Sequence, residues 1–182
     1  LGMHFSDSHE IWQLDRGAAQ CKQSCSVEKI TAQTSFGNIS NIEDGFCFDH
    51  SGDFMRWRFG QSPVYDYYKV AAGENYAIVK IFEDSKNGKK TGDIVDFWQS
   101  SRDREDFTVL LSAAVAELQK QNAEFVTTWA KNNSQMAENL SKVGFKSTGV
   151  KVNFGIKVLN ESFVTLADFS KWDIKMSDAT NY

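Results

Sequence analysis

The sequence predicts an α+β fold, an α/β arrangement of three layers in which helices flank a mixed, mostly antiparallel sheet. Three observations support this prediction. Short segments rich in aromatic and β-branched residues follow one another between turn residues in the middle of the chain. A long amphipathic helical pattern comes next, and the chain then runs through strand, helix and strand patterns.

The segments that precede the central sheet are less regular. Residues 1–15 contain a short apolar run that we interpret as a strand, and residues 16–52 are rich in Ser, Gln, Asn and Thr, which predicts loops and short helices. Residues 51–59 predict one or two helical turns, capped by Ser51 or Asp53 and ended by the following glycine.

The central sheet is predicted from residue type and turn chemistry. Residues 65–72 and 76–82 are strand-forming, and the Gly-Glu-Asn turn between them predicts a hairpin. An exposed turn around Asn87-Gly88 leads to a third strand over residues 93–98. These segments predict a three-stranded antiparallel meander.

The spacing of apolar residues becomes helical after this meander. From Asp103 a long helix is predicted, because apolar residues recur on one face between polar ones. These residues are Phe107, Leu110, Leu111, Ala114, Val115 and Leu118. Residues 125–129 then predict a buried strand, since they are nearly continuous strand formers.

The chain closes with a short helix and a strand. Residues 133–143 predict a helix behind a cap at Asn133 or Ser134, and Gly144-Phe145 follows it directly. Residues 150–158 alternate apolar and polar side chains, which predicts a strand with one buried face and one solvated face.

Composition limits the function classes. The 182 residues carry 20 Lys and Arg against 24 Asp and Glu, a net charge of −4, which favours neither nucleic acid nor an anionic membrane as a partner. No apolar run approaches the ~20 residues of a membrane-spanning helix, so we expect a soluble cytoplasmic protein. The three cysteines are expected to be reduced, and the Cys and His spacing predicts no metal site.

The order of elements resembles the fold of GNAT proteins, the GCN5-related N-acetyltransferases, over roughly residues 50 to 160. Two details of the closing helix add to the resemblance. Asn133 stands eleven residues before Gly144, as in the family's last helix, and residues 142–145 look like the exit from that helix.

A second resemblance concerns a subgroup of these proteins. Residues 54–59, followed by Pro63 and Tyr68, resemble a segment of GNAT-like proteins related to the FemAB group and to polysaccharide-biosynthesis acyltransferases, and so does the tail Trp172–Asp178. Many such proteins carry two GNAT-like domains in tandem.

The first residues fit a tandem arrangement. Gly2-Met3 match Gly144-Phe145, and at the same offset Trp12 and Leu14 match Phe154 and Ile156. Residues 1–15 are therefore either the last strand of a preceding GNAT-like domain or an N-terminal strand, and residues 16–182 form a GNAT-like domain. A cloning remnant before Met3 would account for the first two residues equally well.

The resemblance implies an acyl donor, acetyl-CoA or another acyl-CoA. Its pantetheine arm would pair with the strand that ends at Phe97 and Trp98, and its pyrophosphate would lie on the loop and helix start that follow. The residues so implied are Ser100, Ser101, Arg102 and Arg104, with Asn133 as a further coenzyme contact.

That loop departs from the family pattern. Residues 99–106 contain no glycine, although glycine lets successive N–H groups close on a phosphate. Asp103, Glu105 and Asp106 would repel a phosphate and would complement the helix dipole themselves. The segment is thus either a degenerate pyrophosphate site or simply a well-capped helix start.

The candidate catalytic residue is Asp96. It lies in a predicted strand, on the opposite face from Val95 and Phe97, and would act as a general base for an attacking amine. The alternative is a hydrogen-bonded strand residue. The tyrosine that many family members place on the closing helix, four residues before the Gly-Phe, is Leu140 here, so no phenol there can protonate the leaving thiolate.

Candidate substrate-binding residues flank an aromatic side chain. Arg56 and Arg58 would clamp an anionic substrate such as a nucleotide sugar, or their stems would cover a buried Trp57 while their charges pair locally. Trp129 lies near the end of a strand that should splay from its neighbour, where it would line a pocket or fill the core.

Two functions remain open from the sequence. The first is an N-acyltransferase that moves an acyl group from acyl-CoA to a small amine, an amino sugar being one such acceptor. The second is a non-catalytic GNAT-like domain that binds substrate or assembles with a preceding catalytic domain. A homodimer is a further protein partner compatible with either function.

Overall fold

The computed structural model describes residues 3–17, 25–36, 46–48, 50–99 and 104–179. Its strands are β1 (Met3–Asp15), β2 (Ser26–Lys29), β3 (Tyr67–Ala72), β4 (Asn75–Glu83), β5 (Lys90–Trp98), β6 (Phe125–Lys131) and β7 (Lys146–Lys157). Its helices are α1 (Gly52–Met55), continued by the π-helical turn η1 (Arg56–Gly60), then α2 (Arg104–Lys120) and α3 (Gln135–Val143). Three short 3-10 helices close the chain, η2 (Glu161–Ala167), η3 (Phe169–Lys171) and η4 (Met176–Asp178).

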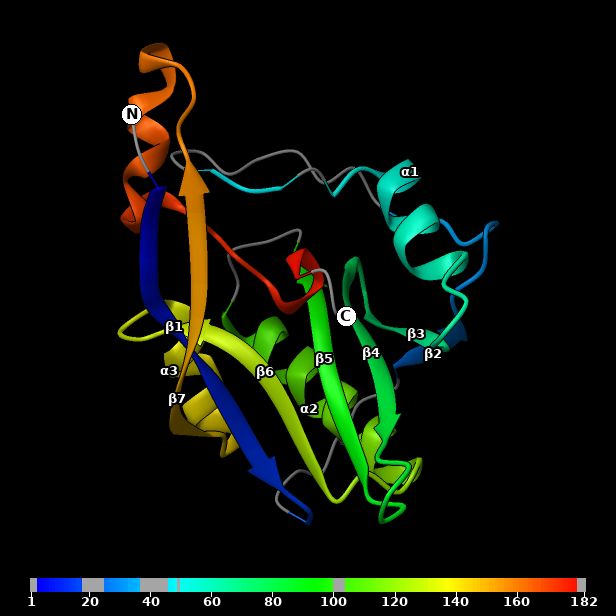
Figure 1. Cartoon of the computed structure of the whole chain (residues 1–182). Helices are drawn as coiled ribbons and strands as arrows, with labels where there is room; N and C mark the ends of the chain where they lie inside the picture. Colours follow the sequence, from blue (N-terminus) through cyan, green and yellow to red (C-terminus); the bar gives the residue numbers. More distant parts are fainter. Residues whose placement is uncertain (1–2, 18–24, 37–45, 49, 100–103, 180–182) are drawn as a thin grey trace.

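These strands form one mixed sheet in the order β2-β3-β4-β5-β6-β1-β7. Strands β5 and β6 are parallel, and every other neighbouring pair is antiparallel. The predicted α+β class and the predicted hairpin of β3 and β4 are therefore confirmed. Strand β1 lies between β6 and β7 and pairs with both (Figure 1). Its assignment to the end of a preceding domain stays a prediction.

The sheet opens between its two parallel strands. Pairing between β5 and β6 covers only Thr91–Asp93 and Phe125–Thr127. Beyond these residues the strands diverge toward their carboxyl ends (Figure 1). An opening between parallel strands is a position where a ligand can reach strand backbone groups.

Hydrophobic cores lie on both faces of the sheet. On one face α2 packs Leu110 and Leu118 against Val79 and Ile94. On the other, α1, η1 and the end of the chain pack against the sheet through a cluster that contains Met55, Phe59, Tyr67, Ile78, Val95 and Met176. The two faces follow from the strand alternation, which sends neighbouring residues of β4 to opposite sides.

Several boundaries differ from those predicted. Strand β7 begins at Lys146, because Gly144 ends α3 in a left-handed conformation (φ 106) and the chain extends at once. It forms the edge of the sheet, and Val150, where the predicted strand begins, is 55% exposed. From Val152 on the predicted alternation is present, because Phe154 and Ile156 are half-buried between exposed residues. Ser134 rather than Asn133 caps α3, since its side chain accepts the Ala137 N–H.

The packing of η1 predicts an effect of its last residue. A Cβ at Gly60 would lie 2.6 Å from the carbonyl carbon and oxygen of Thr31, whereas one at Gly52 would meet only the flexible end of Arg56 at 3.3 Å. We therefore expect Gly60→Ala to lower the free energy of unfolding by about 1–3 kcal/mol. Urea unfolding of both variants checks this, and an equal effect of Gly52→Ala would contradict it.

Candidate active site

A cavity of about 300 Å³ lies where β5 and β6 separate. Its aromatic wall comes from Phe97 and Trp98 at the end of β5 and from Phe107 of α2. Helix α3 adds polar groups, including Asn139, and the C-terminal tail, residues 172–179, adds Lys175. A cavity with an apolar wall and a few convergent polar groups has the character of a ligand site.

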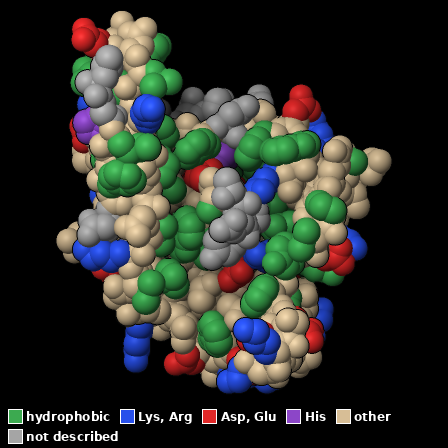
Figure 2. Space-filling view, in the orientation of Figure 1, with side chains coloured by type: hydrophobic (Ala, Val, Ile, Leu, Met, Phe, Trp, Pro, Cys, Tyr) green, Lys and Arg blue, Asp and Glu red, His purple; other side chains and the backbone are tan. Residues whose placement is uncertain are grey.

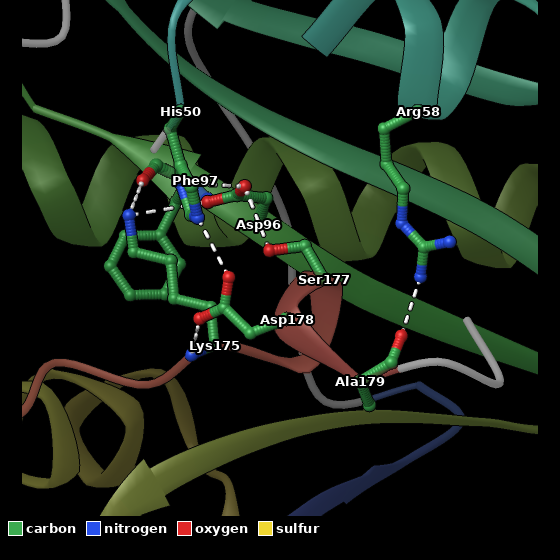
Figure 3. A network of polar contacts seen from close by, with 8 residues as sticks. All are labelled: His50, Arg58, Asp96, Phe97, Lys175, Ser177, Asp178 and Ala179. Carbon is green, nitrogen blue, oxygen red and sulfur yellow. Dashed lines mark hydrogen bonds and ion pairs between the residues drawn. The ribbon is translucent and has the colours of Figure 1, made fainter. Parts of the chain in front are cut away.

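A network of buried charged residues forms one side of this cavity (Figure 3). Asp96 lies at its centre and is 1% exposed. Its Oδ2 accepts a hydrogen bond from Ser177 Oγ at 2.9 Å and lies 3.2 Å from His50 Nδ1. Its Oδ1 accepts the Phe97 N–H at 2.7 Å and lies 3.2 Å from Lys175 Nζ.

His50 links Asp96 to a second carboxylate. Its Nε2 lies 2.8 Å from Asp178 Oδ1, while Nδ1 faces Asp96. Carboxylates only accept hydrogen bonds, so both ring nitrogens donate, as they do in the imidazolium form. Burial alone would lower the pKa of His50, but the hydrogen bond to Asp178 and the charge of Asp96 outweigh burial and raise it.

Lys175 completes the charge balance of the network. Burial is the largest single influence and disfavours its ammonium, but the charges of Asp96, Asp173 and Asp178 and the hydrogen bond to Asp96 together raise the pKa of Lys175. The cations His50 and Lys175 thus face the anions Asp96 and Asp178. Lys175 Nζ also donates to the Phe97 carbonyl oxygen at 2.9 Å, at the open edge of β5. The tail thereby occupies the backbone hydrogen-bond acceptor of Phe97, where β5 separates from β6.

A β-bulge in β5 aims Asp96 at the tail. Ile78 pairs with Asp96 and Val79 pairs with Ile94, so Val95 is the extra residue. Val95 packs in the cluster that contains Met176, and Asp96 bonds the neighbouring Ser177. The prediction that Asp96 faces away from Val95 is therefore wrong. Phe97 turns to the other face, where its ring meets Phe107 at 5.3 Å.

The sequence-predicted residues fall in different places. Phe97 and Trp98 line the cavity, and Asp96 lies behind His50 and Lys175 in its wall. Asn133 is exposed in the turn before α3, with φ 59. Ser100, Ser101 and Arg102 lie outside the described residues, as does the side chain of Arg104.

The predicted substrate-binding residues do not converge on this cavity. Arg56 pairs with Asp53 on its own helix, and Arg58 Nη2 donates to the Ala179 carbonyl at 2.5 Å, which holds the end of the tail. Trp57 is 62% exposed, so the alternative that it is buried is wrong. Trp129 lines a second cavity, on the face of the sheet opposite α2.

Sequence reasoning missed His50, Lys175 and Asp178 as site residues. His50 belongs to no sequence motif, and its partner Asp178 is 128 positions away. The only available signal was the tail Trp172–Asp178, which carries a family resemblance but no indication of what it contacts.

Comparisons with known proteins support the fold. No family model matches the chain, and no curated protein matches it either. Among solved structures, a GCN5-related N-acetyltransferase from Anabaena variabilis is similar with a TM-score of 0.54 at 10% identity, over 85% of this chain and 41% of that one. A functionally unknown conserved protein from Staphylococcus epidermidis is similar with a TM-score of 0.50 at 10% identity, over 84% of this chain and 60% of that one.

These similarities establish a GNAT-like fold. At 10% identity they say nothing about substrate or residue roles, and the chain spans less than two thirds of either structure. In the part of the chain that the structure describes, no helix is long and apolar enough to cross a membrane.

The raised pKa of His50 predicts a pH dependence of stability. A group whose pKa is raised on folding stabilises the protein fully below its unfolded pKa, 6.5 for His, and loses this contribution as pH rises through the folded pKa. We expect the stability difference between the wild type and His50→Gln to shrink from pH 6 to pH 9.

Urea unfolding of both proteins across this range measures the difference directly. His9→Gln is the matched control, because burial lowers the pKa of His9 and its contribution should change with pH in the opposite direction. A difference for His50→Gln that grows with pH would contradict the assignment of a charged His50.

Proposed function

We propose that the protein is an N-acyltransferase that moves an acyl group from acyl-CoA to a small amine at the cavity between β5 and β6. The observation that carries the proposal is the buried His50–Asp96 pair in the wall of this cavity. An imidazole oriented by a carboxylate is a common general base. The GNAT-like fold supports the choice of reaction.

The cavity suits the acyl-pantetheine part of the donor. This arm is apolar along its alkyl segments and carries amide groups, which match the aromatic wall of Phe97 and Phe107 and the polar side chain of Asn139. The Phe97 carbonyl oxygen is an acceptor at the open edge of β5, and Lys175 now holds it. Donor binding in this arrangement therefore requires Lys175 to move.

The same movement would make His50 available as a base. Lys175 and Asp178 belong to one tail segment, so displacing it removes the carboxylate from Nε2 and leaves Asp96 on Nδ1. His50 could then lose its proton and accept one from the amine. The amine nitrogen attacks the thioester carbon, the C–S bond breaks, and the thiolate leaves and takes up a proton. Asp96, expected from the sequence to be the base, acts here through His50.

A second candidate function is a non-catalytic domain that assembles with a preceding domain. It is favoured by the projecting arm formed by the start of β1 together with the end of β7 and η2, which carries several exposed apolar side chains (Figures 1 and 2). Phe5 is 73% exposed and Leu159 75%, with Phe163 and Val164 also exposed. Exposed apolar patches of this kind are typical of protein contact surfaces.

Acetyl-CoA binding separates these functions. We expect Lys175→Met to bind acetyl-CoA roughly tenfold more tightly than the wild type, because the substitution frees the Phe97 carbonyl and weakens the hold of the tail. Isothermal titration calorimetry measures both affinities. Lys171→Met, at an exposed lysine directly before the tail, should bind like the wild type. Absence of binding to all three proteins would favour the non-catalytic function.

The catalytic assignment predicts two losses of activity. In a free-thiol assay with acetyl-CoA and a panel of small amines, His50→Gln should lower kcat by about 10²- to 10⁴-fold, the usual contribution of a general base. Asp96→Asn should lower kcat and move the pH optimum, since it changes the group that orients His50. Unchanged kcat in folded His50→Gln would exclude His50 as the base.

A further inference from the structure

A second cavity, which the proposed function does not use, surrounds a buried lysine. It measures about 310 Å³ and lies on the face of the sheet opposite α2. Four adjacent strands form its floor, with Lys80 from β4, Asp93 from β5, Thr127 from β6 and Ile11 from β1. Lys80 is 2% exposed and Asp93 5%. Both polar side chains are therefore buried at the floor of an open cavity.

The polar groups follow the strand register. Lys80 pairs with Asp93, and Asp93 pairs with Thr127, so the side chains form one row across β4, β5 and β6. Thr127 Oγ1 donates to Asp93 Oδ1 at 2.6 Å, which leaves Oδ2 turned toward Lys80 Nζ at 3.7 Å. At this separation the two groups form an ion pair, and both line the cavity.

The surroundings of Lys80 lower the pKa of its amine. Burial lowers the pKa of Lys80 most, the nearby positive charge of Arg58 lowers it further, and Asp93 only partly offsets both. Burial also raises the pKa of Asp93. An amine that has lost its proton is a nucleophile, and a neighbouring protonated carboxyl can act as an acid.

The rest of the cavity is apolar and aromatic. Lys80 Nζ lies 4.0 Å from the centroid of the Tyr65 ring. Phe82, Trp129 and Met176 complete the wall. A flat, apolar molecule would find contact area beside the amine.

The fold alone does not require the ion pair of Lys80 and Asp93, since well-packed apolar residues usually stabilise a core at least as well as a buried pair of charges.

We propose that Lys80 forms a reversible imine with a small aromatic aldehyde bound in this cavity. The amine nitrogen attacks the carbonyl carbon to give a carbinolamine. Asp93 protonates its hydroxyl group, water leaves, and the C=N bond forms, so that amine and aldehyde give imine and water. Thr127 orients Asp93 for this proton transfer, and the aromatic walls select the aldehyde. The inference is independent of acyl transfer.

Reductive trapping tests the proposal on the full chain. Benzaldehyde and cyanoborohydride convert the imine to a stable benzyl-lysine, and peptide mapping by mass spectrometry locates it. We expect Lys80 to be modified first at neutral pH, ahead of exposed lysines such as Lys29. The hydrogen bond to Asp66 raises the pKa of Lys29. In urea this preference should disappear. Modification of Lys29 with Lys80 unmodified in the folded protein would overturn the proposal.

Two further comparisons test the chemistry. Asp93→Asn should slow modification of Lys80 at least about tenfold while Lys29, in the same digest, is modified at the wild-type rate. Thr127→Val should have a smaller effect in the same direction. An unchanged rate of Lys80 modification in folded Asp93→Asn would show that Asp93 is not the acid and would overturn the mechanism. Faster trapping with acetaldehyde than with benzaldehyde would overturn the aromatic ligand class.

Discussion

The divergence of β5 and β6 after Asp93 determines where both the cavity and the C-terminal tail lie. Past this residue the described backbone pairing with β6 ends, so the backbone groups of β5 need other hydrogen-bond partners. The Ile94 carbonyl accepts from the side chain of Thr128 at 2.9 Å. Lys175 serves the Phe97 carbonyl, and the bulge at Val95 turns Asp96 toward the same tail. One interruption of strand pairing thereby creates a cavity and a docking position for the tail.

The tail is held by buried charged side chains that depend on one another for pairing. Buried cations and anions stabilise a structure only when each is paired and hydrogen-bonded, and removal of one member leaves an uncompensated charge. Here each carboxylate faces a cation from another part of the chain. With the tail in this position, every charge of the network is therefore paired. In the proposed function, a ligand that displaces the tail must supply equivalent partners for these charges.

The tail also separates the two cavities. Lys175 lines the cavity at the β5 and β6 opening, whereas the next residue, Met176, lines the cavity around Lys80. Adjacent side chains of one short segment therefore form a wall of each. Movement of the tail would change the shape of both cavities together, even though their polar residues are different.

Sequence patterns predicted the elements of the fold but not the contacts of the site. Helix α2 and strands β3 to β6 follow from local periodicity and turn residues, which act over a few positions. The bulge at Val95 could not be predicted, because the alternation of β5 looks regular in sequence. Asp96 and Ser177 are 81 positions apart, so their contact depends on tertiary packing that periodicity does not encode.

Boundary residues show the same limit. Asn133 and Ser134 are both residue types that commonly cap helices. Ser134 is the cap of α3, because the backbone of Asn133 is left-handed, a conformation that the sequence does not reveal. The place of β1 between β6 and β7 is likewise a tertiary fact. Strand pattern predicts that residues pair but not with which neighbours.

Amide hydrogen exchange of residues 172–179, with and without acetyl-CoA, tests most directly whether the tail closes the proposed acyl-CoA site. Displacement predicts faster exchange of the tail amides on binding, while the amides of α3 and of the end of β5 become more protected. Binding of acetyl-CoA with unchanged or slower exchange in the tail would contradict a closing role for Lys175.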